Sequence, residues 1–250
     1  MAITIKTQDQ IEKMRVAGNI LKDLIDMLEG MIRPGITTDE LDKAAEDFIK
    51  SRGATPSFLG YSGYPKSLCT SVNEEIVHGI PSSRKLKNGD IISIDMGAYI
   101  DGYHGDCART YGVGEISEAD KKLIDVTRQS FFEGIKFAKA GNHLYEISAA
   151  IQEYAESFGF GVVREYVGHG IGRNMHEDPS IPNYKVPGRG PKLQKGMVLA
   201  IEPMITAGSY KCRVLKDGWT AVTRDGSNAA HYENTVLITD GEPELLTFRK

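Results

Sequence analysis

The sequence predicts an α+β fold whose sheet is largely antiparallel. Helical and extended segments interleave along the 250 residues without the regular alternation that produces a doubly wound parallel sheet. Two of the extended segments are separated only by the turn signal Asp101-Gly102, which is typical of an antiparallel hairpin. Because no segment has the composition of a linker and no repeat is found, we expect residues 1–250 to form a single domain.

Two amphipathic helices are predicted near the N-terminus. The segment TQDQ at residues 7–10 has the pattern of a capping box, and leucines follow it at helical spacing up to Gly30. The segment TTDE at residues 37–40 repeats this signal, and Gly53 is placed to end the second helix. The apolar residues of both helices should face the core.

Two further helices are predicted in the middle of the chain. Ser117 opens the first of them, and its apolar residues recur up to Ala138 before Gly141 stops it. The next helix covers residues 144–158 and ends before Gly159. Their apolar residues should also belong to the core.

Five segments are rich in the β-branched and aromatic residues that favour strands. A loop is predicted over residues 183–195, where Pro187, Gly188, Gly190 and Pro191 prevent regular structure. The expected strands cover residues 90–99, 103–113, 161–166, 197–204 and 232–239.

The composition excludes several classes of protein. The formal net charge of −4 provides no basic field, so we expect no nucleic-acid recognition. No apolar run is long enough to span a membrane and the first residues lack a signal-peptide core, so we expect a cytoplasmic protein without membrane contact. Cys69, Cys107 and Cys212 are odd in number and far apart, which fits neither a disulfide framework nor a cysteine zinc site.

The predicted hairpin brings two acidic side chains together. Because side chains alternate between the faces of a strand, an even-length turn without a bulge places Asp95 and Asp106 on one face, opposite or diagonal to each other. Two carboxylates in a core repel each other unless they share a proton or hold a cation. Two solvated aspartates on an edge hairpin are the alternative.

Two more carboxylates stand at the ends of apolar strand segments. Glu202 follows one such segment and Glu233 begins another, and a carboxylate buried there without a partner would be costly. His169 lies between two glycines, which allow a ligand to approach the backbone closely. Together with Asp95 and Asp106, these residues make five candidate metal ligands.

The charges of the five residues indicate two divalent cations. Four carboxylates and a neutral histidine carry a charge that two divalent cations balance, whereas one zinc ion leaves the site negative. An oxygen-rich ligand set suits Co²⁺, Mn²⁺ or Fe²⁺, with Zn²⁺ or Ni²⁺ as further options. Two cations about 3.5–4 Å apart can activate water and polarise a carbonyl group, which is the chemistry of metal-assisted hydrolysis.

Five motifs stand in a fixed order along the chain. They are SVN at 71–73 with HGIP at 78–81, Asp95 with YHGD at 103–106, GHGIG at 168–172 with HE at 176–177, IEPM at 201–204, and DGWT at 217–220 with YE at 232–233. On these motifs the chain closely resembles the type I methionine aminopeptidases, from about Thr7 to Thr247. Glu202 and Glu233 are only 31 positions apart, without the long insertion of the type II enzymes, and the short N-terminus resembles the minimal bacterial form.

The resemblance implies the pita-bread fold, in which two pseudo-symmetric α+β halves surround a central sheet. It implies a single catalytic peptidase domain that holds two metal ions, with Asp106 and Glu233 bridging them. Glu202 would also accept a proton from water, and His78 and His176 would act beside the substrate as catalytic residues. The implied metal ligands are Asp95, Asp106, His169, Glu202 and Glu233.

A substrate pocket follows from the same resemblance. Met175 stands where the family carries an aromatic residue, and methionine is a soft and adaptable pocket wall. His104 and His231 are expected to be hydrogen-bonded loop histidines, and His143 a turn residue at a helix start. The methionine side chain of the substrate would lie among Phe58, Tyr61, Tyr64, Cys69, Met175 and Trp219, with His78 and His176 beside it.

The expected function is removal of the initiator methionine from nascent polypeptides whose second residue is small. A proline-specific dipeptidase or creatinase-like hydrolase on the same fold is the first alternative, although such enzymes resemble longer chains. A binding protein on an inactive scaffold is the second, but it should have lost ligands, and all five are present. We expect a monomer, and ribosome association stays open because Lys85 and Lys87 are too few to define a docking patch.

Overall fold

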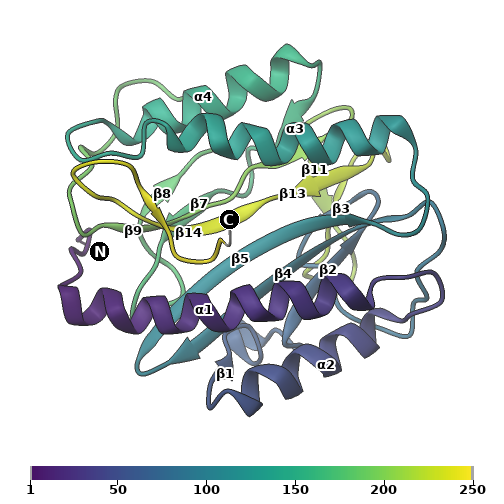
Figure 1. Cartoon of the computed structure of the whole chain (residues 1–250). Helices are drawn as coiled ribbons and strands as arrows, with labels where there is room; N and C mark the ends of the chain where they lie inside the picture. The colour runs from purple at the N-terminus through teal and green to yellow at the C-terminus, as the bar shows by residue number, and fades with distance from the viewer. Residues whose placement is uncertain (1, 249–250) are drawn as a thin grey trace.

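A computed structural model describes residues 2–248 and shows a long sheet flanked by two pairs of helices. In Figure 1, helices α1 and α2 lie below the sheet, and helices α3 and α4 lie above it. Every pair of neighbouring strands in the three sheets is antiparallel. The predicted α+β class with a largely antiparallel sheet is therefore confirmed.

The four predicted helices are present. Helices α1 (Gln8–Met31) and α2 (Thr38–Ser51) both begin with the predicted capping boxes. Helix α3 (Glu118–Ile135) begins after Ser117, whose side chain accepts a hydrogen bond from the backbone of Asp120, and α4 covers Leu144–Ser157. None of the helices in residues 2–248 is both long and apolar enough to cross a membrane.

The predicted end of the third helix is wrong. The helix stops at Ile135, so Ala138 and Gly141 lie in the connection to α4. The backbone N–H of Ala138 donates to Ile135 in a tight turn, and the N–H groups of Ala140 and Gly141 donate to Thr239 and Leu193. These hydrogen bonds to other segments replace the helical ones, while Ala138 remains buried as the pattern predicted.

The long sheet contains the strands that carry Asp95, Asp106, His169 and Glu233, and β9, which Glu202 directly follows. Its order is β1, β4, β5, β14, β9, β7, β8, with β2 also beside β4 and β15 beside β14. Two small sheets have the orders β13, β10, β6 and β11, β12, β3. The strands are β1 (Thr55–Pro56), β2 (Leu68–Val72), β3 (Glu75–Val77), β4 (Ile91–Ile100), β5 (Tyr103–Gly112), β6 (Gly161–Val162), β7 (Gly168–Gly170), β8 (Glu177–Ile181), β9 (Val198–Ile201), β10 (Met204–Thr206), β11 (Cys212–Val214), β12 (Ala221–Thr223), β13 (Ala229–His231), β14 (Glu233–Leu237) and β15 (Glu244–Leu245).

Two of the five predicted strands need correction. The segment 161–166 forms strand only at its first two residues, and the segment 197–204 is divided between β9 and β10. Pro203, at the division, has no N–H to donate to a sheet, and β9 and β10 belong to different sheets. The predicted loop 183–195 is confirmed, because it contains no strand or helix.

The hairpin of β4 and β5 has the predicted geometry. Asp101 and Gly102 form its two-residue turn with positive φ angles of 52° and 82°. Gly97 pairs with Asp106 while Asp95 pairs with Ala108, so the two aspartates are diagonal neighbours on one face. The predicted juxtaposition is therefore confirmed.

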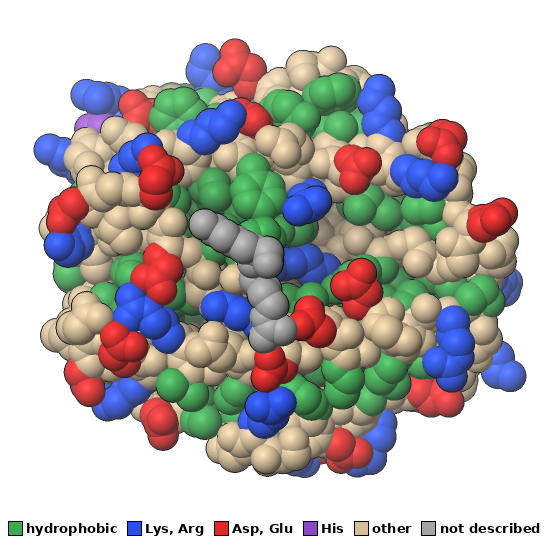
Figure 2. All heavy atoms as spheres, viewed as in Figure 1, with side chains coloured by type: hydrophobic (Ala, Val, Ile, Leu, Met, Phe, Trp, Pro, Cys, Tyr) green, Lys and Arg blue, Asp and Glu red, His purple; other side chains and the backbone are tan. Residues whose placement is uncertain are grey.

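The opposite face of the hairpin packs against the N-terminal helices. Met96 and Cys107 pair across the two strands and belong to the fully buried core formed with α1 and α2. Phe131 of α3 and Ile147 of α4 belong to a second apolar core, which they share with residues of β9 and β14. Burial of these apolar side chains leaves the hairpin's aspartate face free for chemistry. Charged side chains of both signs are interspersed over the face of the molecule seen in Figure 2.

We predict opposite stability effects for two glycine-to-alanine substitutions in α1. At Gly18 a Cβ atom would lie 2.2 Å from the carbonyl oxygen of Leu246, whereas at Gly30 it would meet nothing within 4 Å. Gly18→Ala should therefore destabilise the fold by about 1–3 kcal/mol. Gly30→Ala should stabilise it by about 0.5–1 kcal/mol through the higher helix propensity of alanine. Chemical denaturation of both variants tests this, and equal shifts of the two midpoints would contradict the packing.

Candidate active site

The five candidate ligands share one face of the long sheet. Asp95 pairs with Ala108, which in turn pairs with Glu233, so the three side chains form a row across β4, β5 and β14. Asp106 precedes Ala108 by two residues and points to the same side, since side chains alternate along a strand. Three of the four carboxylates thus converge through strand register alone.

The other two candidates reach this face from the C-terminal half. His169 on β7 pairs with Ala200 on β9, and Ala200 pairs with Thr235, two residues beyond Glu233 on β14. Glu202 directly follows β9, two residues after Ala200. The strand order therefore brings together residues separated by more than one hundred positions in the chain.

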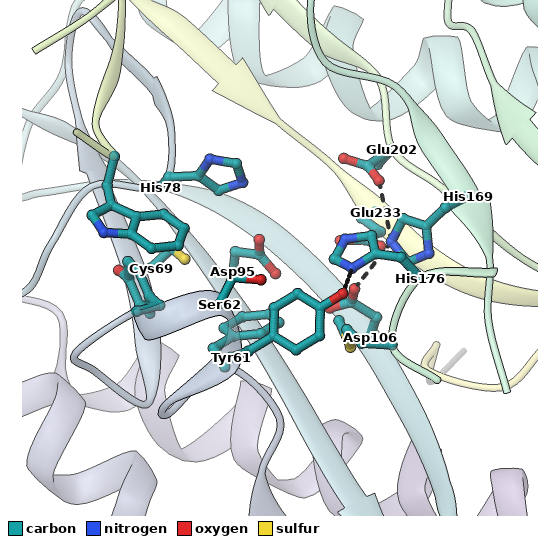
Figure 3. Close-up of a pocket in the computed structure, with 14 residues that line it drawn as sticks. Tyr61, Ser62, Cys69, His78, Asp95, Asp106, His169, His176, Glu202 and Glu233 are labelled. Atoms are coloured by element: carbon teal, nitrogen blue, oxygen red, sulfur yellow. Dashed lines mark hydrogen bonds and ion pairs between the residues drawn. The ribbon is translucent and has the colours of Figure 1, made fainter. Parts of the chain in front are cut away.

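Distances within the cluster fit a metal centre. Nε2 of His169 is 3.6 Å from Oδ2 of Asp106 and 3.6 Å from Oε1 of Glu202. Asp106, His169 and Glu233 are buried, and each offers a ligand atom within 4.8 Å of the others. One oxygen each of Asp95, Asp106 and Glu233 is buried without a hydrogen-bond partner in the described part of the chain. An oxygen-rich set with unpartnered oxygens is the chemistry that binds a divalent cation. Figure 3 shows these side chains pointing toward one another.

The electrostatics of the four carboxyl groups lead to the same conclusion. Withdrawal from water raises the pKa of Asp106 to about 7. Burial first, and then repulsion from neighbouring carboxylates, also raises the pKa of Asp95, Glu202 and Glu233 above the usual range. Without a cation, the cluster is therefore driven to hold protons. Divalent cations would remove this need by neutralising the charge directly.

His169 presents a free lone pair to the cluster. Its Nδ1 lies 2.9 Å from the carbonyl oxygen of Gly170, which can only accept, so the proton is assigned to Nδ1. Burial lowers the pKa of His169 to about 4, so the ring is neutral near pH 7. Its Nε2 therefore carries a lone pair, as a metal ligand requires.

His176 is held between the cluster and the opposite side of the pocket. Its Nδ1 is 2.8 Å from the hydroxyl of Tyr61, and its ring centroid is 4.2 Å from that of His169. Burial and the neighbouring His169 lower the pKa of His176 to about 4. The next residue, Glu177, forms a buried ion pair with Lys6 at 2.7 Å, which anchors this loop to the N-terminal segment.

The sequence-predicted pocket residues surround the same space. Tyr64 and Trp219 meet edge to face with centroids 5.1 Å apart, and the Tyr64 hydroxyl donates toward the carbonyl groups of Leu68 and Gly79. Cys69 is buried with a free thiol, as are Cys107 and Cys212. The cavity has a volume of about 170 Å³ and is lined by Phe58, Tyr61, Ser62, Tyr64, Cys69, His78, Asp95, Asp106, His169, Met175, His176, Glu202, Trp219 and Glu233.

His78 enters the cavity from a strained backbone position. Its φ angle is +60°, and its ring lies edge-on to Trp219 at 6.4 Å and to Tyr166 at 5.3 Å. Gly79 follows because a Cβ atom there would lie 2.2 Å from the carbonyl oxygen of Thr70. Burial lowers the pKa of His78 to about 4, so this ring is also neutral near pH 7. A strained, neutral histidine facing a cavity is suited to binding a substrate.

Two residues near the site were not among the predicted site residues. Ser62 lines the cavity at a φ angle of +50°, and its only sequence signal is its place between Gly60 and Gly63. His231 was expected to be a hydrogen-bonded loop histidine, and this is wrong. It lies on strand β13, and its buried Nε2 has no hydrogen-bond partner within residues 2–248. The nearest carboxylate oxygen is Oε2 of Glu202, at 3.7 Å.

The remaining two histidines agree better with expectation. His104 is hydrogen-bonded through Nδ1 to Ser57 at 2.9 Å, although it lies on strand β5 and not in a loop. His143 stands at the start of α4, and its Nδ1 bonds to the carbonyl group of Gly190 at 3.1 Å. Neither ring lines the cavity.

Comparisons with known proteins identify relatives over almost the whole chain. A model of metallopeptidase family M24 matches residues 12–240. The chain is 60% identical to a methionine aminopeptidase of Clostridium acetobutylicum over 98% of either chain. The structure of a methionine aminopeptidase from Rickettsia prowazekii has a TM-score of 0.97 and 43% identity, covering 99% of this chain and 100% of that one. A prolidase from Pyrococcus furiosus has a TM-score of 0.77 and 25% identity, covering 98% of this chain and 66% of that one.

The family match and the structural likeness extend over almost the whole chain, which assigns it the pita-bread fold of these proteins. The buried cluster of Asp106, His169 and Glu233 is compatible with the divalent metal that a metallopeptidase uses. On this evidence, the chain belongs to metallopeptidase family M24.

Proposed function

We propose that this protein is a methionine aminopeptidase that removes the initiator methionine from nascent polypeptides with a small second residue. The observation that carries the proposal is the position of the five candidate ligands at one end of an apolar, aromatic pocket. In the proposed complex, the methionine side chain of the substrate lies in the pocket and its first peptide bond lies at the ligands. The higher identity to methionine aminopeptidases than to prolidases supports this function over a proline-specific dipeptidase.

The proposed cofactor is a pair of divalent ions, Co²⁺, Mn²⁺ or Fe²⁺, with Zn²⁺ or Ni²⁺ as further options. The ligands are Asp95, Asp106, His169, Glu202 and Glu233. As the family resemblance implies, Asp106 and Glu233 would hold both ions. Oδ2 of Asp106 lies 3.6 Å from Nε2 of His169, and Glu233 shares a row across the strands with Asp95, which supports this assignment. Bound divalent ions supply Lewis acidity and lower the pKa of water.

Three side chains of the protein have distinct roles in the proposed reaction. Glu202 accepts the proton of the attacking water, since its carboxylate lines the cavity beside His169. If the Tyr61 hydroxyl donates to Nδ1 of His176, the Nε2–H of His176 is directed away from Tyr61 and can stabilise the developing oxyanion. His78, on the opposite wall beside Trp219, orients the peptide chain.

The proposed cellular location of the protein follows from its proposed substrate. Nascent N-termini are the partners, and they are made in the cytoplasm, so we place the protein there. We assign the whole chain to one catalytic domain, because both halves contribute ligands to the site. A monomer is sufficient for this chemistry.

We predict that the metal-free protein loses stability as the pH rises between about pH 4 and about pH 7. Asp106, with a pKa of about 7, keeps a proton in the folded state that an unfolded aspartate has already released. The folded state therefore binds more protons, and its advantage disappears as the pH passes the raised pKa. Bound divalent ions replace the proton and should remove this loss. Thermal unfolding across this range with chelator and with Mn²⁺ measures the effect. Identical pH dependence in both series would argue against a metal centre.

We predict that His176→Ala lowers kcat by about 10²–10³, the usual loss for one oxyanion donor, with metal content unchanged. His78→Ala should lower activity similarly by disturbing substrate orientation. His143→Ala is the control, because this histidine lies outside the cavity. Steady-state kinetics and metal analysis provide the readout. Loss of bound metal in either active-site variant would show that ligands and substrate-contacting residues have been assigned incorrectly.

The test of the proposed function is a series of Met-Xaa tripeptides together with an Xaa-Pro dipeptide. Burying an unbranched thioether in the apolar pocket should contribute roughly 1.5–3 kcal/mol, or about 10- to 150-fold over a small side chain. Methionine should be preferred at the first position and Gly, Ala or Ser accepted at the second. Rejection of leucine must come from its branching, because its transfer free energy is similar.

Release of the first amino acid by metal-loaded protein is the readout for this series. Faster cleavage of the Xaa-Pro dipeptide than of Met-Ala-Ser would overturn the proposal in favour of a proline-specific dipeptidase. Absence of turnover with every peptide would favour a binding protein.

A further inference from the structure

His231 is a buried polar group that the proposed reaction leaves unused. Its side chain lies at the inner side of β13 and is 2% exposed. The backbone around it is held firmly, because its N–H donates to the hydroxyl of Thr110 at 2.8 Å and its carbonyl group accepts from the same hydroxyl at 2.9 Å. The main chain at His231 is therefore held beside β5, and the buried ring has its unpartnered Nε2 close to Glu202.

The carboxylate of Glu202 requires a hydrogen-bond donor, and His231 can supply it. The two carboxylate oxygens of Glu202 each face an imidazole, Oε1 toward His169 at 3.6 Å and Oε2 toward His231 at 3.7 Å. His169 cannot donate from Nε2, because its proton is on Nδ1 facing Gly170. Asn183 donates to the backbone carbonyl group of Glu202 and does not hold the carboxylate. His231 is thus the neighbouring imidazole that can donate to Glu202.

We propose that His231 is a positioning residue of the metal centre, whose Nε2–H donates to Oε2 of Glu202 and directs Oε1 toward the ion beside His169. This inference rests on the proposed role of Glu202 as a ligand. A charge-assisted N–H···O hydrogen bond is about 2.7–2.9 Å long, so a carboxylate shift of about 1 Å completes it. Such a shift is small for a side chain at the edge of a cavity.

The expected consequence is tighter metal binding. A carboxylate that is free to rotate must be ordered when the ion binds, whereas one held by a hydrogen bond is already oriented. Loss of such an outer partner typically lowers metal affinity by about 10–100-fold. The effect should be confined to the ion that Glu202 shares with His169.

Two amide substitutions at His231 distinguish a hydrogen-bonding role of this residue from a packing role. The amide nitrogen of His231→Gln reaches about as far as Nε2 of histidine, whereas that of His231→Asn reaches only about as far as Nδ1. Titration calorimetry of the metal-free proteins with Mn²⁺ should give an affinity near that of the unaltered protein for the Gln variant. The Asn variant should bind about 10–100-fold more weakly.

Matched controls exclude an effect of folding. His143→Gln and His143→Asn make the same exchanges outside the cavity and should leave Mn²⁺ affinity unchanged. Unfolding midpoints of the metal-free His231 variants show whether both fold. Equal Mn²⁺ affinity of the two His231 variants would overturn the inference.

A double variant tests whether His231 acts through Glu202. In the Glu202→Gln background, His231→Asn should cause no further loss of Mn²⁺ affinity, since the interaction is already removed. Additive losses would overturn the inference while leaving the ligand set intact. Unchanged affinity in Glu202→Gln alone would remove Glu202 from the ligand set, and the inference would fail with it.

Discussion

The repulsion among four carboxylates on one sheet face is the constraint on which the rest of this structure depends. Burial raises the pKa of each of the four carboxyl groups, and repulsion from neighbouring carboxylates raises it further for Asp95, Glu202 and Glu233. Such a cluster opposes folding until protons or cations neutralise it. The fold must therefore hold it in place with interactions made elsewhere.

Those interactions lie on the opposite face of the same strands. Met96 and Cys107 belong to the apolar core under α1 and α2, while Asp95 and Asp106, their neighbours in sequence, face the cavity. Alternation along each strand thus separates hydrophobic stabilisation from charge by one residue. A shift of one residue in register would exchange the two faces, so the core that stabilises the sheet also fixes the ligands.

The neutral histidines complete the site without adding charge. Burial lowers the pKa of His78, His169 and His176 to about 4, so near pH 7 the rings serve as lone-pair or N–H groups. The hydrogen bond between Tyr61 and His176 joins segments 115 residues apart, across the pocket. The candidate ligands and the residues that line the pocket therefore come from both halves of the chain, and neither half alone contains the candidate site.

The sequence by itself determined the helices, the hairpin and the identity of the candidate ligands, because capping boxes, alternation and short turns are local in origin. The face shared by Asp95 and Asp106 could be predicted for the same reason. Only the tertiary structure decided the separation of β9 from β10 at Pro203, because the two parts of that segment pair with strands of two different sheets. It also decided the place of His231, since the pairing of β13 with β10, and not any local motif, brings that ring to Glu202.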